Sequence, residues 1–417
     1  MHKRGHEHRL RGSRLPPSLG GRMRFAGIDI ASETHVLAIV NGDGGVEVKA
    51  TPFGEDLAGY EKALGLLGTP GETLVAMAAT GHYWKNLFAV LASAGHRVAL
   101  LNPLRTRRFA DEDLERTKTD AIDALGIARF AAQKRPTPTH LPDAAAEELR
   151  ELVRLRERLL QDFGDRVRQL HRLVDLGFPE FTRYVRSLDS ELASAILHDY
   201  PTAAAFRGVS VKRLAALRYD GRHPVGLDLA RTLIDAARRS VGHHHGAAYR
   251  VQVRYACQDL DILRRRLREL DHDIEGKLRE HEVGRLLTTI DGIGTNTAAF
   301  VIAEVGDPAA HFRSASALAA YVGAIPGLKQ SGKRTTSRAA LTPVGNARLR
   351  KALWMPTLTA VRYNPWLRSH YQRLRARGKL PKVALIACMH KLLLAIYSVA
   401  KHRKPFVPQL AAAETAR

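Results

Sequence analysis

The chain has very little cysteine and no long apolar run. Cys257 and Cys388 are the only cysteines among 417 residues, and both lie in apolar helical patterns. Their scarcity excludes a disulfide framework and a cysteine-based metal site, and it fits a reducing cytosol. No apolar run approaches the length of a bilayer span, and the first 22 residues lack an apolar signal core. We therefore predict a cytoplasmic protein without a membrane partner.

Acidic residues are also few relative to basic ones. Lys and Arg number 65 against 42 Asp and Glu, so the formal net charge is +23 and the isoelectric point is about 10.4. A surface charged only for solubility needs no such excess, whereas phosphate neutralisation releases counterions and drives binding to a polyanion. The composition therefore predicts a nucleic-acid partner. No RNA-recognition or zinc-finger motif is visible, so the sequence shows no protein module for base recognition.

Patterns along the chain predict an α/β part followed by all-α parts. "FAGIDIA" and "HVLAIVNGDGGV" indicate a β-hairpin, and "TLVAMAA" and "RVALLNP" indicate further strands, each beside a helical stretch. This order is typical of a mixed sheet flanked by helices. The expected segments are a disordered basic tail (1–22), an α/β domain (23–141), a coiled-coil or linker domain (142–285), a helical domain (286–405) and a flexible tail (406–417).

Two series of apolar residues in alternating four-three steps predict a pair of long helices meeting along a narrow seam. In the first series Arg156 is the one polar exception. We expect an antiparallel coiled-coil arm with an irregular tip, paired within the chain or with another subunit. The tip contains His243–His245, for which a solvated loop is a simpler interpretation than a metal site. The series are Leu149, Val153, Leu160, Phe163, Val167, Leu170 and Val174, and Val253, Ala256, Leu260, Leu263, Leu267, Leu270 and Ile274.

Three aspartates carry the pattern of a metal site. Asp29 lies in a buried apolar strand, where an unpaired carboxylate costs several kcal/mol. Asp120 and Asp123 begin a later helix on one face. Taken singly, Asp29 could bond a turn and the pair could be a solvated first helical turn. Taken together, a strand carboxylate and a helix pair suit two-metal phosphoryl chemistry with Mg²⁺ or Mn²⁺.

The N-terminal motifs resemble a known family. "GIDIASETH", "ATGHYW", "LLNPLRTRRFA" and "RTKTDAIDALGIARF" are similar in order and spacing to the RuvC-like (RNase H-type) domain of the DEDD transposases of insertion-sequence family one-ten. These are bridge-RNA-guided recombinases related to the pilin-gene invertases. The resemblance implies that Asp29, Asp120 and Asp123 match the first, third and fourth acidic residues, which bind the metal.

The second acidic residue of the family is replaced in this chain. A Glu is expected two residues before "TG", where Ala78 stands. The alternatives are a substitution made to trap a substrate complex, a naturally decayed copy, or compensation by another acid such as Glu33, Asp111 or Asp113. Because alanine is tolerated in a buried strand, we expect the fold to survive while metal binding and cleavage are impaired.

The C-terminal part resembles the serine transposase domain of the same family. The resemblance covers "TTIDGIGTNTAAFVIAEVGD", "FRSASALAAYVGAIP", "SG" and "GNARLRKAL". It implies that Ser331 of "SG" is the nucleophile that links covalently to DNA, with Ser337 as a rival; an ordinary loop serine is the plain alternative. Asn346 and Asn364 are predicted helix N-caps.

Basic and glycine-rich motifs are candidate nucleic-acid contacts. "IDGIG" (Ile290–Gly294) resembles a helix-hairpin-helix element, whose N–H groups can bind a phosphate, although a tight turn also requires such glycines. "NPWLRSHYQRLRARGKLPK" combines arginines with aromatic residues that suit backbone contact and base stacking, or packing in a core. The specific candidates are Arg105, Arg107, Arg108, Lys118, Lys333, Arg334, Arg338, Arg348, Arg350, Gly292 and Gly294.

The sequence therefore predicts a bacterial, nucleoid-associated transposase or DNA recombinase. By resemblance its partners are double-stranded DNA (element end and target), a bridge RNA as guide, and further copies of the chain in a dimer or tetramer. A RuvC-type hydrolytic junction nuclease is one alternative, although it would need only the acidic domain. A non-catalytic nucleic-acid-binding protein with a vestigial acidic cluster is another.

Overall fold

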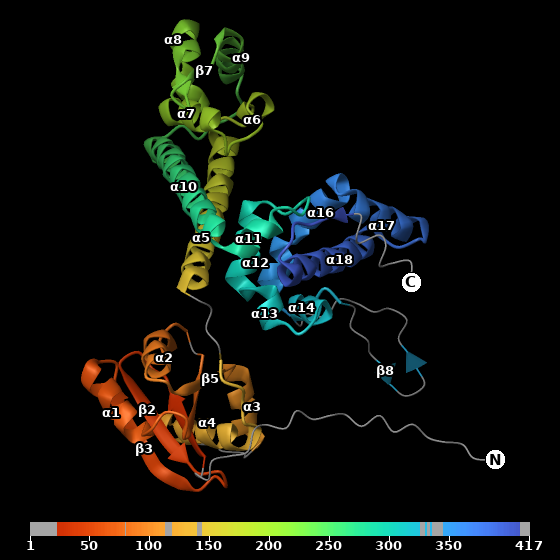
Figure 1. Ribbon diagram of the computed structural model, residues 1–417. Helices are drawn as coiled ribbons and strands as arrows, with labels where there is room; N and C mark the ends of the chain where they lie inside the picture. Colours follow the sequence, from red (N-terminus) through yellow and green to blue (C-terminus); the bar gives the residue numbers. More distant parts are fainter. Residues whose placement is uncertain are drawn as a thin grey trace, which may run out of the picture. The chain divides into compact units, whose positions relative to one another are not determined.

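The protein was analysed as a computed structural model that describes residues 23–79, 81–112, 119–139, 144–325, 330–331, 334–335 and 345–408. Contacts between residues divide the chain into two compact units, Met1–Leu141 and Pro142–Arg417 (Figure 1). The first unit is mixed α/β and the second is almost entirely helical. The predicted fold classes are confirmed at this level.

A five-stranded sheet forms the centre of the first unit, in the order β3-β2-β1-β4-β5. β1 pairs antiparallel with β2 and β2 with β3, whereas β1, β4 and β5 are parallel. The antiparallel start and the parallel continuation follow the predicted order and are consistent with a RuvC-like domain. The strands are β1 (Arg24–Asp29), β2 (Thr34–Val40), β3 (Val46–Gly54), β4 (Thr73–Ala78) and β5 (Arg97–Leu101).

Helices cover both faces of this sheet because the strands are apolar on both sides. Ile28 and Met77 pack with α1 (Leu57–Leu67) and α2 (Trp84–Ser93). Phe25, Ala76 and Ala78, on the opposite face, pack with α3 (Pro103–Glu112) and α4 (Asp120–Lys134). β1, β2, β4 and β5 therefore alternate between two buried layers, as a sheet sandwiched by helices requires, whereas β3 is mostly exposed.

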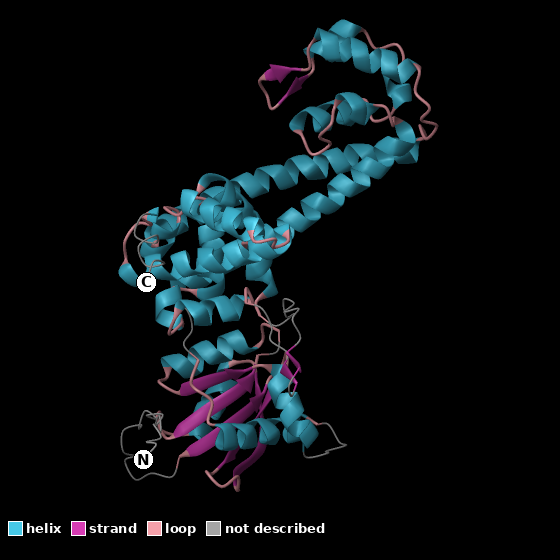
Figure 2. Cartoon of the chain, turned by 90° about the vertical axis from the view of Figure 1, so that its right-hand side faces the viewer, coloured by secondary structure: helices cyan, strands magenta, loops and turns pink. Residues whose placement is uncertain are grey.

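Two helices of 34 residues each form an antiparallel pair in the second unit: α5 (Ala144–Gly177) and α10 (Ala247–Glu280). They lie side by side in Figure 2. Ion pairs join Glu148 to Lys277, Arg156 to Asp271 and Arg166 to Asp259. The residue numbers on α10 fall as those on α5 rise, as they do in an antiparallel pair. The predicted arm is thus paired within the chain, and Arg156 is accommodated in the seam by a carboxylate 2.5 Å away.

The segment between the two long helices is folded, so the expectation of an irregular tip is wrong. Short helices and a small hairpin bury their own apolar cluster, which includes Phe178, Phe181 and Phe206, against one end of the arm. Sequence patterns missed them, and all of them except the last, which has twelve residues, are shorter than ten residues. They are α6 (Phe181–Tyr184), α7 (Glu191–Asp199), a 3-10 turn (Ala203–Phe206), α8 (Val211–Ala216), β6 (Arg218–Tyr219), β7 (His223–Pro224) and α9 (Leu227–Arg238).

The C-terminal helices surround α18 (Pro381–His402), drawn in blue in Figure 1. They are α11 (Glu282–Leu287), α12 (Thr295–Val305), α13 (Pro308–His311), α14 (Ala315–Val322), α15 (Ala347–Ala352), α16 (Trp354–Tyr363) and α17 (Pro365–Ala376). Asn346 and Asn364 cap α15 and α17 through their side chains, as predicted.

Helix α18 corrects the statement that no apolar run could span a bilayer. The helix has 22 residues, and an 18-residue window within it has a mean hydropathy of 1.9, which by length and composition suffices. However, 56% of its apolar window is buried inside the unit, where Met389, Leu392 and Ile396 join one large cluster with α12 and α14. This burial is typical of a core helix.

Candidate active site

Helix α4 packs directly on β1 at Gly27. A side chain on Gly27 would place its Cβ 2.2 Å from the carbonyl oxygen of Ala124 and from the nitrogen of Ala128, so only glycine allows this approach. Because side chains alternate along a strand, Asp29 leaves β1 on the same face as Gly27. Asp29 is half-buried at the last position of the strand.

The first turn of α4 lies over the end of β1 that bears Asp29. Ala124 of α4 clusters with Val36, which is the strand partner of Asp29. The later residues of α4 cluster instead with Phe25, at the start of β1. Helix and strand are therefore antiparallel, and the turn carrying Asp120 and Asp123 is at the same edge of the sheet as Asp29. The Thr119 hydroxyl caps this turn by accepting from Ile122 N at 3.3 Å.

Ala78 lies at the same edge. β4 runs parallel to β1 with Met77 beside Ile28, so the next position along β4 lies beside Asp29. Ala78 is 7% exposed and belongs to the cluster on the α4 face. A longer side chain at this position would therefore leave the strand toward the side that carries the aspartates. Alanine contributes no ligand there.

The three aspartates do not form a closed metal site in this chain. Among the side chains that the structure describes, no group of three or more His, Cys, Asp or Glu residues could hold an ion. Asp120 is exposed, and both Asp29 and Asp123 make other polar interactions. Carboxylate oxygens are the donors that Mg²⁺ prefers, so the donor type fits, but the ligand set lacks the member expected at position 78.

Three acids were considered as substitutes for the expected glutamate. Of these, Glu33 is exposed in the turn after β1. The side chains of Asp111 and Asp113 lie outside the part of the chain that the structure describes.

A histidine missed by sequence reasoning supports the turn after Asp29. His35 is fully buried, and its Nδ1 accepts from Ala31 N at 3.3 Å. Its Nε2 therefore carries the proton and donates to Glu55 Oε2 at 2.5 Å. Asn86 Nδ2 donates to the other oxygen of Glu55 at 3.0 Å. A histidine within the apolar run "HVLAIV" was the signal that could have revealed this group.

The Glu55 carboxylate is stabilised in its charged form. Burial raises its pKa, but the nearby Tyr60 hydroxyl and the hydrogen bonds from His35 and Asn86 outweigh that effect, so the pKa is lower than its ordinary value of 4.5. Burial and the adjacent Glu55 raise the pKa of Tyr60. The group thus links β2 and the end of β3 to α1 and α2, directly behind the edge that carries Asp29.

Ser331 lies in a small two-stranded hairpin of the second unit. β8 (Gln330–Ser331) pairs antiparallel with β9 (Arg334–Thr335), and Ser331 is directly opposite Arg334. The described part of this hairpin is its backbone. The rival nucleophile Ser337 and the basic candidates Lys118, Lys333 and Arg338 lie outside the described residues, as does the side chain of Arg334.

The two ends of the segment that contains this hairpin are held together. Gly345 has a φ of +119°, and a Cβ on it would lie 2.7 Å from the nitrogen of Gly323 at the end of α14. Asn346 N donates to the carbonyl of Tyr321 at 2.7 Å. The end of α14 and the start of α15 are therefore neighbours, and the backbone leaves and returns at this one point.

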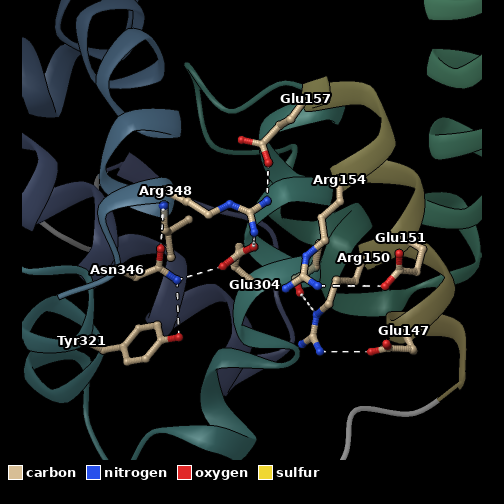
Figure 3. Close-up of polar contacts among 11 residues, drawn as sticks. Glu147, Arg150, Glu151, Arg154, Glu157, Glu304, Tyr321, Asn346 and Arg348 are labelled. Atoms are coloured by element: carbon tan, nitrogen blue, oxygen red, sulfur yellow. Dashed lines mark hydrogen bonds and ion pairs between the residues drawn. The ribbon is translucent and has the colours of Figure 1, made fainter. Parts of the chain in front are cut away.

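Glu304 of α12 joins this point to the arm (Figure 3). Its carboxylate accepts from Asn346 Nδ2 at 2.9 Å and pairs with Arg348 at 3.3 Å, while Arg348 also pairs with Glu157 of α5. Beside them, Arg150 Nε donates to the carbonyl of Ala303 at 2.6 Å. The Glu304 side chain is only 9% exposed, whereas the Arg348 side chain is 42% exposed, so the glutamate is shielded from water and the arginine is not.

The described arginine candidates differ in their surroundings. Arg107 and Arg108 are exposed on α3, which Phe109 anchors to Phe130 of α4 in an edge-on ring contact at 5.3 Å. Arg105, on the same helix, lies over the Phe130 ring at 5.5 Å. Arg348 makes the ion pairs described above, and Arg350 donates to the carbonyl of Val322 at 3.1 Å. Their contacts with nucleic acid stay predictions.

The glycine-rich turn between α11 and α12 has a clear packing reason. Gly292 has a φ of +100°, and a Cβ on it would lie 2.6 Å from the Cβ of Ala360 in α16. Gly294, by contrast, is exposed at the N-cap of α12 with open space around it. The tight-turn interpretation thus accounts for Gly292, and phosphate binding at Gly294 stays a prediction.

A mixed α/β unit with aspartates at one sheet edge, followed by a helical unit, is compatible with a polynucleotidyl-transfer enzyme of the transposase class. Comparison with protein families agrees. Residues 26–179 match a family model described as a DEDD transposase of the IS110 type, and residues 284–372 match a model described as the transposase of the IS116/IS110/IS902 family. The chain belongs to the IS110 family of transposases.

Similar proteins extend over almost the whole chain. The IS117 mini-circle protein of Streptomyces coelicolor is 28% identical over 93% of this chain and 96% of its own length. The 42 kDa protein of insertion element IS900 from Mycobacterium paratuberculosis is 26% identical over 92% and 97%. The pilin gene-inverting protein of Moraxella bovis is 26% identical over 79% and 80%.

Proposed function

We propose that this transposase cuts and rejoins DNA by using the acidic edge of the first unit together with Ser331 of the second. Membership of the family implies DNA as the substrate. The observation that carries the proposal is the meeting of Asp29 with the first turn of α4 at one edge of the sheet, although 91 residues separate Asp29 from Asp120 in sequence.

In the proposed reaction the Ser331 hydroxyl attacks a DNA phosphorus atom. The new Oγ–P bond replaces a P–O bond to deoxyribose, the serine proton passes to solvent or to a nearby base, and the leaving oxygen takes up a proton. The phosphoserine linkage retains the bond energy of the cleaved phosphodiester. A second DNA hydroxyl can therefore displace Ser331 without ATP. Arg334, opposite Ser331 in the hairpin, suits stabilisation of the charge on the phosphate.

Asp29, Asp120 and Asp123 would hold Mg²⁺ or Mn²⁺. When bound, the ion polarises the phosphate and stabilises the leaving oxygen. The carboxylates of this chain would orient the ion from β1 and α4. With Ala78 in place of a fourth ligand, we propose that the chain binds DNA but cleaves it slowly.

Replacement of Ser331 by Ala tests the nucleophile. The expected result is that covalent protein–DNA adducts, seen on a denaturing gel with labelled DNA, disappear while DNA binding is retained. A Ser337→Ala variant is the matched control, since it removes a hydroxyl from the same segment. An adduct that survives Ser331→Ala and is lost in Ser337→Ala would reassign the nucleophile, and an adduct that survives in both would overturn the serine mechanism.

We further propose that a bridge RNA selects the target, because no base-recognition motif of a known kind is present in the sequence. Purified protein with and without the non-coding transcript that flanks its gene provides the test. Sequence-selective DNA binding should require the RNA. Equal selectivity without it would contradict guidance and leave the cleavage mechanism unaffected.

A further inference from the structure

The C-terminal part of the chain has positive charge without any acidic residue. Residues 308–413 contain 19 Lys and Arg and no Asp or Glu. Any carboxylate that pairs with these basic residues within the chain must therefore come from outside residues 308–413. Among the described residues, Arg348 and Arg403 find such carboxylates, whereas no ion pair joins any basic residue of α17 or α18.

Two of these basic residues, Arg373 of α17 and Lys391 of α18, lie close to His370. Trp366, His370 and Arg373 are spaced four and three residues apart, so they follow one stripe of α17. Lys391 of α18 lies against this stripe, with its Nζ 4.5 Å from the centre of the Trp366 ring. The packing of the two helices fixes this arrangement, since Leu367 and Cys388 are buried between them.

The side chains in this cluster repel one another. Burial lowers the pKa of His370, and the nearby charges of Lys391 and Arg373 lower it further. Burial likewise lowers the pKa of Lys391, to which Arg373 adds. His370 and Lys391 are half-buried and Arg373 is exposed, so the cluster remains open to solvent on one side. Bringing like charges together in this way lowers the stability of the folded protein, and a bound anion would offset that loss.

We propose that His370, Arg373 and Lys391 form a binding site for a phosphodiester group of nucleic acid, with Trp366 as its floor. Arginine and lysine supply charge-assisted hydrogen bonds to phosphate oxygens, and the imidazole adds a donor when the phosphate raises its proton affinity. The half-buried position strengthens each contact relative to a fully solvated lysine. The site rests on the proposed function only for its choice of nucleic acid as the anion.

The test uses the full chain with Ser331→Ala, so that cleavage does not interfere, and compares Arg373→Gln and Lys391→Gln. Affinity is measured at several salt concentrations for a DNA duplex and, separately, for an RNA. Each variant should weaken binding by roughly three- to tenfold and reduce the slope of log K against log salt by about one, as expected for one lost phosphate contact. The nucleic acid that shows the loss is the one bound at this site.

Arg375→Gln is the matched control. Arg375 carries the same charge on the same helix, but it lies nine residues from Trp366 and therefore on the opposite side of α17. Losses in Arg373→Gln and Lys391→Gln no greater than in Arg375→Gln, for both nucleic acids, would overturn the site. If these losses appear in the Ser331→Ala background but the chain with Ser331 intact forms no covalent DNA adduct, only the cleavage mechanism is contradicted.

A second readout separates a binding site from a structural cluster. Arg373→Gln removes repulsion without removing the contact between Lys391 and Trp366, so the melting temperature of the free protein should stay unchanged or rise. The pKa of His370, followed by NMR, should rise in this variant and also when nucleic acid binds to the unsubstituted cluster. A lower melting temperature together with unchanged affinity would show that Arg373 serves the fold alone.

Discussion

A side chain at position 78 leaves β4 on the face covered by α4, one strand away from Asp29. If position 78 is a ligand position, as proposed, the site differs from a complete one by this single residue. Since Ala78 ends its strand at the sheet edge, a longer side chain there can extend past the buried cluster toward the first turn of α4.

Ala78→Glu should therefore increase Mg²⁺-dependent DNA cleavage, by about 100-fold or more if it supplies a direct ligand. The measurement is the rate of adduct formation with the same DNA at fixed Mg²⁺. Ala78→Gln is the control, because it has the same length without the charge, and it should restore little. Equal rates for the glutamate variant and the unsubstituted chain would show that position 78 is not a ligand position.

Glu55 gives a prediction about pH and stability. Its pKa in the folded protein is below the ordinary value of 4.5, so the charged carboxylate contributes stability above that pH and loses it as pH falls through the folded value. The difference in unfolding free energy between the unsubstituted chain and Glu55→Gln should be constant above about pH 5.5 and shrink below pH 4.5. Urea denaturation at several pH values measures it, and a difference that grows toward low pH would contradict the network around His35.

At the scale of helices and strands, some glycines are required by close packing rather than by a binding function. The turn before α12 places Gly292 against α16, with a positive φ and no room for a Cβ.

Long elements with strong periodicity, such as α5 and α10, could be predicted from the sequence, and so could the caps Asn346 and Asn364. The short elements of the tip could not, because two to nine residues do not reveal a period and their stability comes from packing in the tip cluster. The twelve-residue α9 was missed as well, as were α1, α3 and β3; β3 is mostly exposed, and α3 has few apolar residues.

Gly292→Ala should destabilise the second unit by about 2 kcal/mol or more, because it combines backbone strain with a clash against Ala360. Gly276→Ala is the control. Gly276 lies inside α10 with nothing near its Cβ position, so alanine there should stabilise by about 0.5–1 kcal/mol. Chemical denaturation measures both changes, and equal effects would show that the turn does not pack as described.

The contacts of Glu304 predict a similar contrast between ion pairs. Glu304→Gln removes the charge from a side chain that is only 9% exposed and leaves Arg348 with one carboxylate instead of two, so a loss of about 1–3 kcal/mol is expected. Glu275→Gln removes an exposed pair with Arg279 on α10, which should cost less than about 0.5 kcal/mol. Denaturation curves would contradict this if the two variants lost equal stability.

At the scale of the whole molecule, the candidate residues are divided between two compact units. Asp29, Asp120 and Asp123 belong to one, and Ser331 belongs to the other. Sequence motifs predicted that the aspartates share a site, and the strand end and the helix start that carry them lie at one edge of the sheet. Their side-chain geometry could not be predicted in the same way, because Asp29 and Asp123 also make other polar interactions that no sequence pattern reveals.

If the two halves meet between chains of an oligomer, inactive variants should complement each other. In an Ala78→Glu background, Asp29→Asn and Ser331→Ala should each abolish adduct formation. Mixing the two should restore a measurable fraction of it, because some sites then combine an intact acidic edge with an intact serine. The same variants combined in one chain are the control. No recovery on mixing would place both halves of each site in a single chain.

The antiparallel course of α5 and α10 has a consequence for variation and for engineering. The chain travels out along one helix and comes back along the other, so everything between residues 178 and 246 is attached through neighbouring positions at the far end of the pair. A replacement module whose own termini are equally close could be grafted there without rerouting the remaining polypeptide. The tip is accordingly a natural attachment point for a fluorescent reporter or for a new recognition domain.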